Sequence, residues 1–280
     1  MEHLNSWIYL WITKMEENEI SESAKWPIIL MRNEGRSVVW AVSYWLGVDC
    51  KGIPGQACRL LERFISIRTR NVYRQLDIDE MRNVHQILTT QSLLYVACCV
   101  NLASKMCSAA LSRGTHMIQE YLAEHGFDCS CEVIKSTESD IFSTLGFQIP
   151  LYTSVEVAEI IAMDVGLPQD LIEEVAVLTN LLEYRRDKLT DLIQISVVLV
   201  RLTESLEFTS LRMIHITAGA VATVIIQHNL VDATSSRPTP IIRLQRLTEL
   251  PFTLLRCIVN SIYDIVRMLD KEREERDSKS

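Results

Sequence analysis

Two charged residues, Lys105 and Glu138, lie in segments where the other residues at helical spacing are apolar. Lys105 is the last residue of a row at spacings of four, four and three, which consists of Leu94, Cys98, Leu102 and Lys105. Glu138 lies within a second row at helical spacing, which consists of Ile134, Glu138, Ile141 and Leu145. These spacings put each charge on, or just beside, an apolar helix face. A single charge buried without a partner is costly, so each should be paired or lie at the rim of the helix bundle. The chemistry they could support is therefore an internal ion pair or a charged contact with a partner.

Metal binding is the second chemistry that the residues could support. Cys129 and Cys131 are separated by one residue, and His116 and His125 are near them in the sequence. Zinc sites are usually built from two pairs of ligands with wider spacing, so loop thiols are the favoured interpretation. We therefore expect no metal at these residues.

Catalytic chemistry has weaker support still. Asp187 and Asp191 share a helix face, as in all-helical metal-dependent synthases, but a working cluster needs further carboxylates. A helix N-cap and a solvated charge explain these two residues better. The sequence contains no glycine-rich phosphate loop and no nucleophile elbow. We expect no enzyme, no cofactor and no small-molecule substrate.

The element that must position Lys105 is a helix that is apolar all round. From Leu93 to Ala103 only Asn101 is polar. Such a helix has to be buried, and this run is too short to cross a bilayer, which takes about 20 residues. A second stretch of the same character, Leu211 to Leu230, follows a little over a hundred residues later. We therefore expect two helical units, each wrapped around one buried helix.

Helical spacing of apolar residues accounts for most of the remaining chain, and no alternating strand pattern competes with it. Residues 68–86 are charged and are expected to form a polar insertion or a helix extension into solvent. Five helices fit between residues 36 and 146, over 36–46, 54–65, 87–106, 114–125 and 131–145. The second half is expected to hold helices over 154–163, 168–184, 189–202, 211–230, 241–247 and 252–269.

Composition narrows the class of partner. The net charge of −8 provides no basic surface for nucleic acid, and the eight cysteines show no disulfide framework. The apolar run 7–12 is too short for a signal peptide or an anchor, so no membrane is expected. Residues 1–35 are expected to be an N-terminal arm that packs on the body or binds a partner, and 271–280 a charged tail.

Three segments carry a resemblance to the cyclin family. Ala57-Cys-Arg-Leu-Leu-Glu62-Arg63-Phe64-Ile-Ser is similar to the second-helix motif of the cyclin box, with Glu62 in place of aspartate. Leu102-Ala103-Ser104-Lys105 is similar to the end of the third helix, and Glu138 to Phe147 resembles the fifth. The resemblance gives structural roles to Ala57, Glu62, Arg63, Phe64, Leu102 and Ala103, and makes Lys105 and Glu138 the residues that contact a kinase partner.

The resemblance implies an all-α cyclin fold of two consecutive five-helix repeats, a cyclin box over 36–149 and a second repeat over 150–270. Within the family the chain is most similar to the divergent cyclin N-terminal domain-containing proteins of meiotic crossover maturation. This implies a non-catalytic regulatory or scaffold protein of the nucleus, associated with chromosomes in meiotic cells and also with the cytoplasm. Its partners would be proteins, among them a cyclin-dependent kinase and meiotic recombination proteins. A kinase-activating cyclin and a transcription-factor-type cyclin-fold module are the alternatives.

Overall fold

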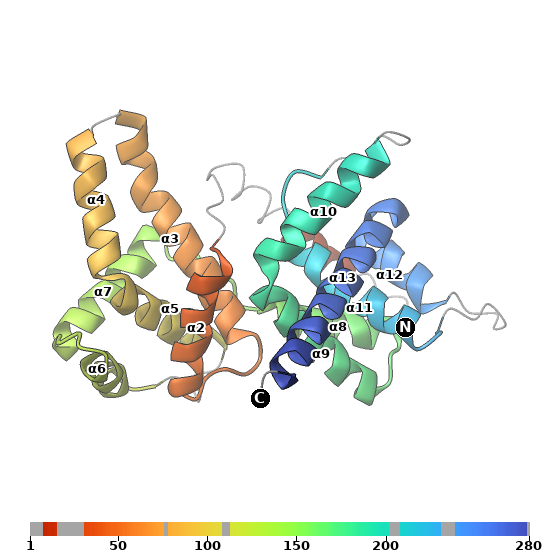
Figure 1. Cartoon of the computed structure of the whole chain (residues 1–280), viewed down its shortest axis with the longest axis horizontal. Helices are drawn as coiled ribbons and strands as arrows, with labels where there is room; N and C mark the ends of the chain where they lie inside the picture. The colour runs from red at the N-terminus through yellow and green to blue at the C-terminus, as the bar shows by residue number, and fades with distance from the viewer. Residues whose placement is uncertain are drawn as a thin grey trace. The chain divides into compact units, whose positions relative to one another are not determined.

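The computed structural model describes residues 8–15, 31–75, 78–107, 113–201, 208–230 and 239–278. This part of the chain is helical and contains no strand, which confirms the all-α class. The helices divide into two compact units (Figure 1). The N-terminal unit is Ser21–Thr153, and the C-terminal unit combines Ser154–Ser280 with Met1–Ile20.

The N-terminal unit is built around one buried helix, α5 (Ser92–Cys107). Every residue from Leu94 to Ser104 is buried, as the all-round apolar sequence predicts. Helices α2, α3 and α7 pack directly against α5, and α4 and α6 contact it less. The other helices of the unit are α2 (Asn33–Trp45), α3 (Ile53–Gln75), α4 (Ile78–Thr90), α6 (Thr115–Glu124) and α7 (Cys131–Thr144).

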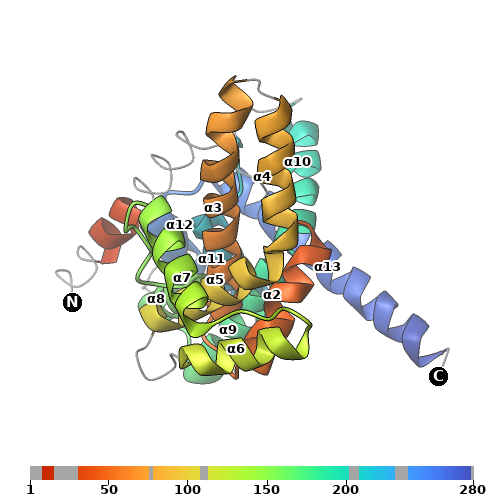
Figure 2. The same cartoon turned by 90° about the vertical axis from the view of Figure 1, so that its left-hand side faces the viewer.

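The expectation of five helices in this unit is wrong by one helix. Residues 78–90 form a separate helix, α4, none of whose residues is buried, and the buried helix begins at Ser92 instead of Ile87. Acidic residues in the first turn of α4 favour a helix start there, because they face the positive end of the helix dipole. Helices α3 and α4 run side by side as a hairpin (Figures 1 and 2).

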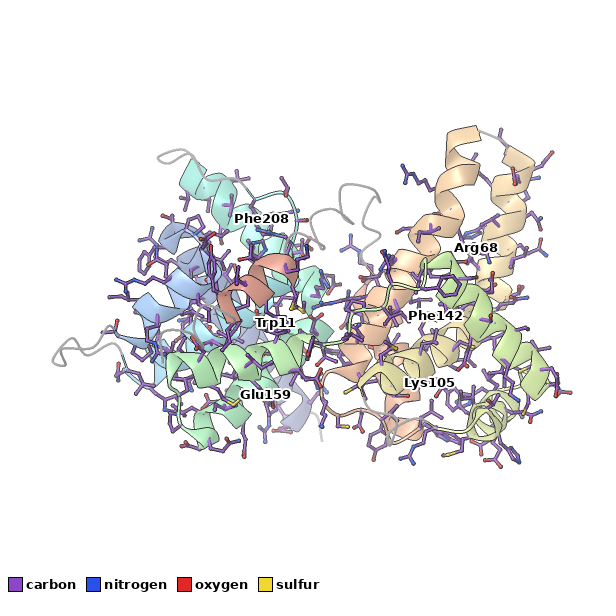
Figure 3. All side chains as sticks on the ribbon, turned by 180° about the vertical axis from the view of Figure 1, so that it is seen from behind. Trp11, Arg68, Lys105, Phe142, Glu159 and Phe208 are labelled. Carbon is purple, nitrogen blue, oxygen red and sulfur yellow. The ribbon has the colours of Figure 1, made fainter. Side chains whose placement is uncertain are left out.

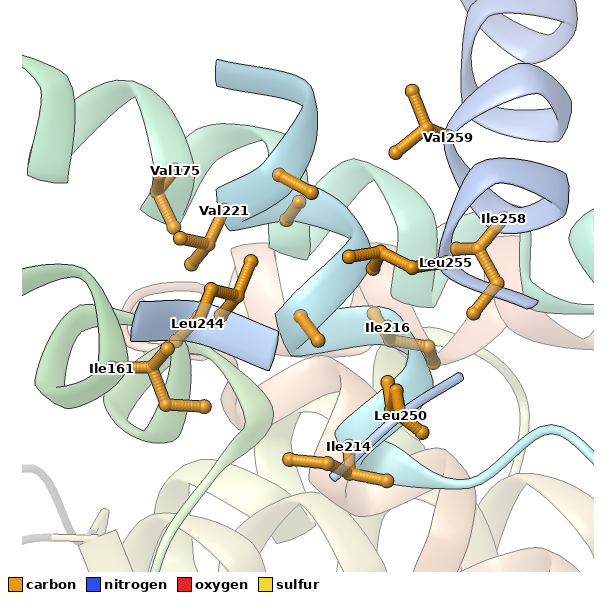
Figure 4. Close-up of a cluster of buried hydrophobic side chains, with 14 of the residues drawn as sticks. Ile161, Val175, Ile214, Ile216, Val221, Leu244, Leu250, Leu255, Ile258 and Val259 are labelled. Carbon is orange, nitrogen blue, oxygen red and sulfur yellow. The ribbon is translucent and has the colours of Figure 1, made fainter. Parts of the chain in front are cut away.

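The C-terminal unit is arranged in the same way around α11 (Met213–Gln227), in which every residue from Met213 to Ile225 is buried. Val221 faces Val175 on one side of α11, and Ile216 lies towards Leu255 on the other (Figure 4). The surrounding helices are α8 (Ser154–Val165), α9 (Gln169–Tyr184), α10 (Arg186–Arg201), α12 (Pro240–Thr248) and α13 (Phe252–Asp277). The expected second buried helix is confirmed, whereas the expected five-helix count is wrong here too, because the described part of this unit contains six helices, α8 to α13, besides the helix over 8–15.

The two ends of the chain both belong to the C-terminal unit. Residues 8–15 form a helix whose Ile8 and Ile12 are buried in the core of that unit. The hydroxyl of Tyr9 donates a hydrogen bond of 2.5 Å to Glu249 Oε1. The described part of the expected N-terminal arm therefore packs on the body. At the other end, α13 continues to Asp277, and its residues from Arg273 onward are exposed.

No single helix in the described ranges has both the length and the apolar composition needed to cross a membrane. Helices α4 and α5 meet that test only when taken together, and they are bent by 65° relative to each other.

Candidate partner-binding site

The structure brings Lys105 and Glu138 together. Lys105 lies in the last turn of α5 and Glu138 in the middle of α7, and Lys105 Nζ donates to Glu138 Oε2 at 2.7 Å. The Glu138 side chain is 9% exposed, whereas that of Lys105 is 37% exposed. The carboxylate is therefore held inside the unit, and the ammonium lies at its rim.

Asn101 is a third member of this site that the sequence analysis did not select. It lies one turn before Lys105 on α5, is 1% exposed, and donates from Nδ2 to the second carboxylate oxygen of Glu138. Its Oδ1 is buried and has no hydrogen-bond partner among the described residues. The signal was present in the sequence, because Asn101 is the only polar residue between Leu93 and Ala103.

Glu62 pairs with an arginine from another helix. Arg36 of α2 donates to Glu62 Oε1 at 2.5 Å, and the two side chains are 0% and 7% exposed. The backbone N–H of Met31 donates to the same carboxylate oxygen at 2.8 Å, and Arg36 Nε donates to Met31 O at 3.0 Å. The buried pair fixes the start of α2 against α3.

Arg63 joins α3 to the end of α7. Its guanidinium donates to Leu145 O at 3.2 Å and to Gln148 O at 2.8 Å. Carbonyl groups at a helix C-terminus lack partners within the helix, so a cation there is favourable. Two further members of the α3 motif, Ala57 and Phe64, are fully buried, and Leu102 and Ala103 are buried on α5.

Further charged and aromatic side chains of the N-terminal unit lie on α3, on α7 and just after α7. Arg68, Phe142 and Lys105 lie along the same face of the N-terminal unit (Figure 3). Arg68 forms an ion pair with Asp140, and its guanidinium lies 5.5 Å from the centre of the Phe64 ring. Phe142 makes an edge-to-face contact with Phe147, whose side chain is 67% exposed.

The thiols of Cys98 and Cys99, near the ion pair, are buried. Burial raises the pKa of the Cys98 thiol far above its ordinary value, and the Glu138 carboxylate raises it further while Lys105 opposes the shift. Burial likewise raises the pKa of Cys99. Because the thiolate is the nucleophilic form of cysteine, both side chains stay protonated and act as small apolar residues.

The residues considered for a metal do not gather into a site. Cys131 Sγ donates to Gln119 Oε1 at 3.1 Å, and Gln119 Nε2 donates to Cys129 O at 2.9 Å. His125 Nδ1 lies 2.8 Å from Tyr121 O. Across the described ranges, no three His, Cys, Asp or Glu side chains are grouped to hold a metal ion.

The two aspartates of α10 also stay apart from any such group. Asp187, which is buried in the first turn, accepts a hydrogen bond of 2.8 Å from the N–H of Lys188. Asp191 is exposed on the same helix.

In comparisons with known proteins, no family model, no curated protein and no solved structure matches this chain.

Proposed function

We propose that this chain is a non-catalytic, cyclin-like regulatory or scaffold protein that binds protein partners through the face carrying Lys105 and Glu138. One observation supports this most: three sequence motifs, on α3, α5 and α7, are joined by direct contacts. Arg63 of the first motif binds the carbonyl of Leu145 in the third, and Lys105 of the second binds Glu138 of the third. Motifs that are far apart in the chain but meet through direct side-chain contacts fit the proposed cyclin box.

The geometry of the ion pair favours a role in recognition. An ammonium group has three donors, and the bond to Glu138 uses one of them. The Lys105 side chain is also partly exposed, so its ammonium can reach acceptors outside the chain, such as backbone carbonyls or a carboxylate of a partner. Glu138, held by Asn101 and Lys105, fixes the direction of that ammonium.

By resemblance, the process we propose is meiotic crossover formation in the nucleus, and the partners are meiotic recombination proteins. The specific observation that favours the alternative, a kinase-activating cyclin, is the same ion pair, because the matching residues of cyclins contact the kinase. The two proposals therefore share a binding face and differ in the partner that occupies it.

Affinity capture from meiotic cells with the tagged full chain separates these proposals. The wild-type chain should retain recombination proteins, and Lys105→Met should lose them. Arg82→Met is the matched control, because its pair with Asp79 on α4 is exposed at both side chains. Capture of a cyclin-dependent kinase alone, lost with Lys105→Met, would support the kinase-activating alternative. Equal capture by wild type and Lys105→Met would contradict both.

A further inference from the structure

We propose that Thr239 is a phosphorylation site for a proline-directed serine/threonine kinase. Thr239-Pro240 is the only place in the 280 residues where proline follows a serine or threonine. Proline lacks the backbone N–H that every other residue carries. A kinase pocket that offers no acceptor at the position after the target residue selects proline there, because other residues would bury an unpaired donor.

The conformation of Thr239 leaves its hydroxyl available. Thr239 is partly exposed, and its backbone is extended, with φ −59° and ψ 153°. It occupies the N-cap position of α12, where a threonine side chain usually accepts a hydrogen bond from the helix, but this hydroxyl makes no capping bond. The nucleophilic oxygen is therefore not tied to the first turn of α12.

The reaction is an ordinary phosphoryl transfer from ATP. Thr239 Oγ1 forms a bond to the γ-phosphorus as the bond from that phosphorus to the bridging oxygen of ADP breaks, and the hydroxyl proton passes to the catalytic base of the kinase. The product carries a charge of about −1.5 to −2 at neutral pH, ahead of a helix with no acidic residue in its first turn. Since negative charge is favourable at that end of a helix, phosphorylation should stabilise the first turn of α12.

Arg243, one turn into α12, is the cation that would feel this charge. Its guanidinium now donates to the backbone carbonyls of Asp164 and Val165 at the end of α8. A phosphate on Thr239 would compete with those carbonyls for the same guanidinium. Modification would therefore act on the contact between α12 and α8 in the C-terminal unit.

The test uses the full chain, ATP, magnesium and a purified proline-directed kinase that is active by itself, so that its outcome does not depend on the proposed function. Mass spectrometry should find phosphate on Thr239, and Thr239→Val should abolish that modification. Pro240→Ala keeps the hydroxyl and should also remain unmodified, with melting temperatures confirming that both variants fold. Phosphate elsewhere but not on Thr239, or equal modification of Pro240→Ala, would overturn the assignment.

The consequence for α12 has its own readout. Hydrogen exchange of the backbone N–H groups of Ile242 and Arg243 should slow after phosphorylation, because both close the first turn by bonding to Thr239 O. Exchange at the end of α13 serves as the internal control and should not change. Unchanged exchange at Ile242 and Arg243 in fully phosphorylated protein would contradict the proposed stabilisation.

Discussion

At the scale of single residues, the sequence predicts where the charges of the site lie but not which residues they pair with. Helical spacing predicts that Lys105 and Glu138 either find partners or lie at the rim of the helix bundle. In the structure the two residues pair with each other, with Glu138 buried and Lys105 at the rim. The spacing could not identify which residues would meet, because pairing joins different helices. For the same reason Arg36 and Asn101 were missed, although both are polar residues on helices with apolar faces.

The buried Arg36–Glu62 pair provides a stability prediction. Arg36→Met should lower the free energy of unfolding by about 3–5 kcal/mol, because it leaves the Glu62 carboxylate buried with less compensation. The double variant Arg36→Met/Glu62→Leu should recover much of that loss, since two well-packed apolar groups can replace a buried ion pair. Chemical unfolding of both variants measures the effect.

Arg68→Met is the control, because its pair with Asp140 is 43% and 46% exposed and exposed pairs contribute only about 0–1 kcal/mol. An equal loss in Arg36→Met and Arg68→Met would show that burial of the first pair does not matter.

His215 predicts a dependence of stability on pH. Burial, with smaller effects from Arg212 and Arg186, lowers the pKa of His215 to about 3 in the folded chain, against 6.5 for an unperturbed histidine. The unfolded chain therefore binds the proton first, so this contribution to stability is complete above pH 6.5 and is lost as the pH falls towards 3. Between pH 6.5 and pH 5 the loss is about 2 kcal/mol.

Unfolding free energies measured at several pH values should fall less steeply below pH 6.5 in His215→Gln than in the wild type. His116→Gln controls for the removal of an exposed histidine, because the His116 side chain is 79% exposed. An identical slope in wild type and His215→Gln would refute the assignment to His215.

At the scale of secondary structure, the two central helices are the best predicted elements. A stretch without a polar face has to be buried wherever it lies, so α5 and α11 could be recognised without any knowledge of their partners. Helix α4 was not predicted as a separate helix, although Met81, Val84 and Leu88 recur at helical spacing on its partly buried side, because the charged residues between them outweighed this pattern. Its charged sequence fitted an insertion or a helix extension equally well.

Close packing of α11 against α13 depends on Gly219. A Cβ at this position would collide with the side chain of Ile258 and lie 3.0 Å from Ile262 Cδ1. Gly219→Ala should therefore destabilise the chain by about 1–3 kcal/mol, the usual cost of overpacking, despite the better helix propensity of alanine. Adding Ile258→Ala should relieve part of the clash, which a double-mutant cycle measures.

Gly114→Ala is the matched control, because nothing lies within 4 Å of a Cβ added there and its φ is −62°. If Gly219→Ala and Gly114→Ala had the same melting temperature, close approach at Gly219 would not be a constraint.

At the scale of the whole molecule, the chain forms two units that each have their own core. The sequence predicts this division from the spacing of the two apolar helices. It does not reveal that residues 8–15 belong with the C-terminal unit, because their two buried isoleucines could have packed on either unit. Only the tertiary structure shows where such a short amphipathic segment lies.

Ile12→Asp should therefore weaken the C-terminal unit, because it buries a charge among the apolar residues of that unit's core. The N-terminal unit should be unaffected. Hydrogen exchange should speed up in α8, α11 and α12, with little change in α5. Ala97→Asp is the mirror variant, because Ala97 is fully buried in the core of the N-terminal unit, and it should produce the opposite pattern. Faster exchange confined to α5 in Ile12→Asp would contradict the placement of residues 8–15.

Binding of a purified partner, measured beside the melting temperature, tests the central claim that the Lys105–Glu138 face is an interface. Lys105→Met should weaken binding by about 2–5 kcal/mol if Lys105 is buried and paired in the complex. Its melting temperature should also fall, because the Glu138 carboxylate stays buried with less compensation, so binding is measured below the melting temperature of every variant. Glu138→Gln should weaken binding less, since the amide can still hold the ammonium. Unchanged binding in both single variants and in the double variant would contradict the interface and leave an ion pair that serves only the fold.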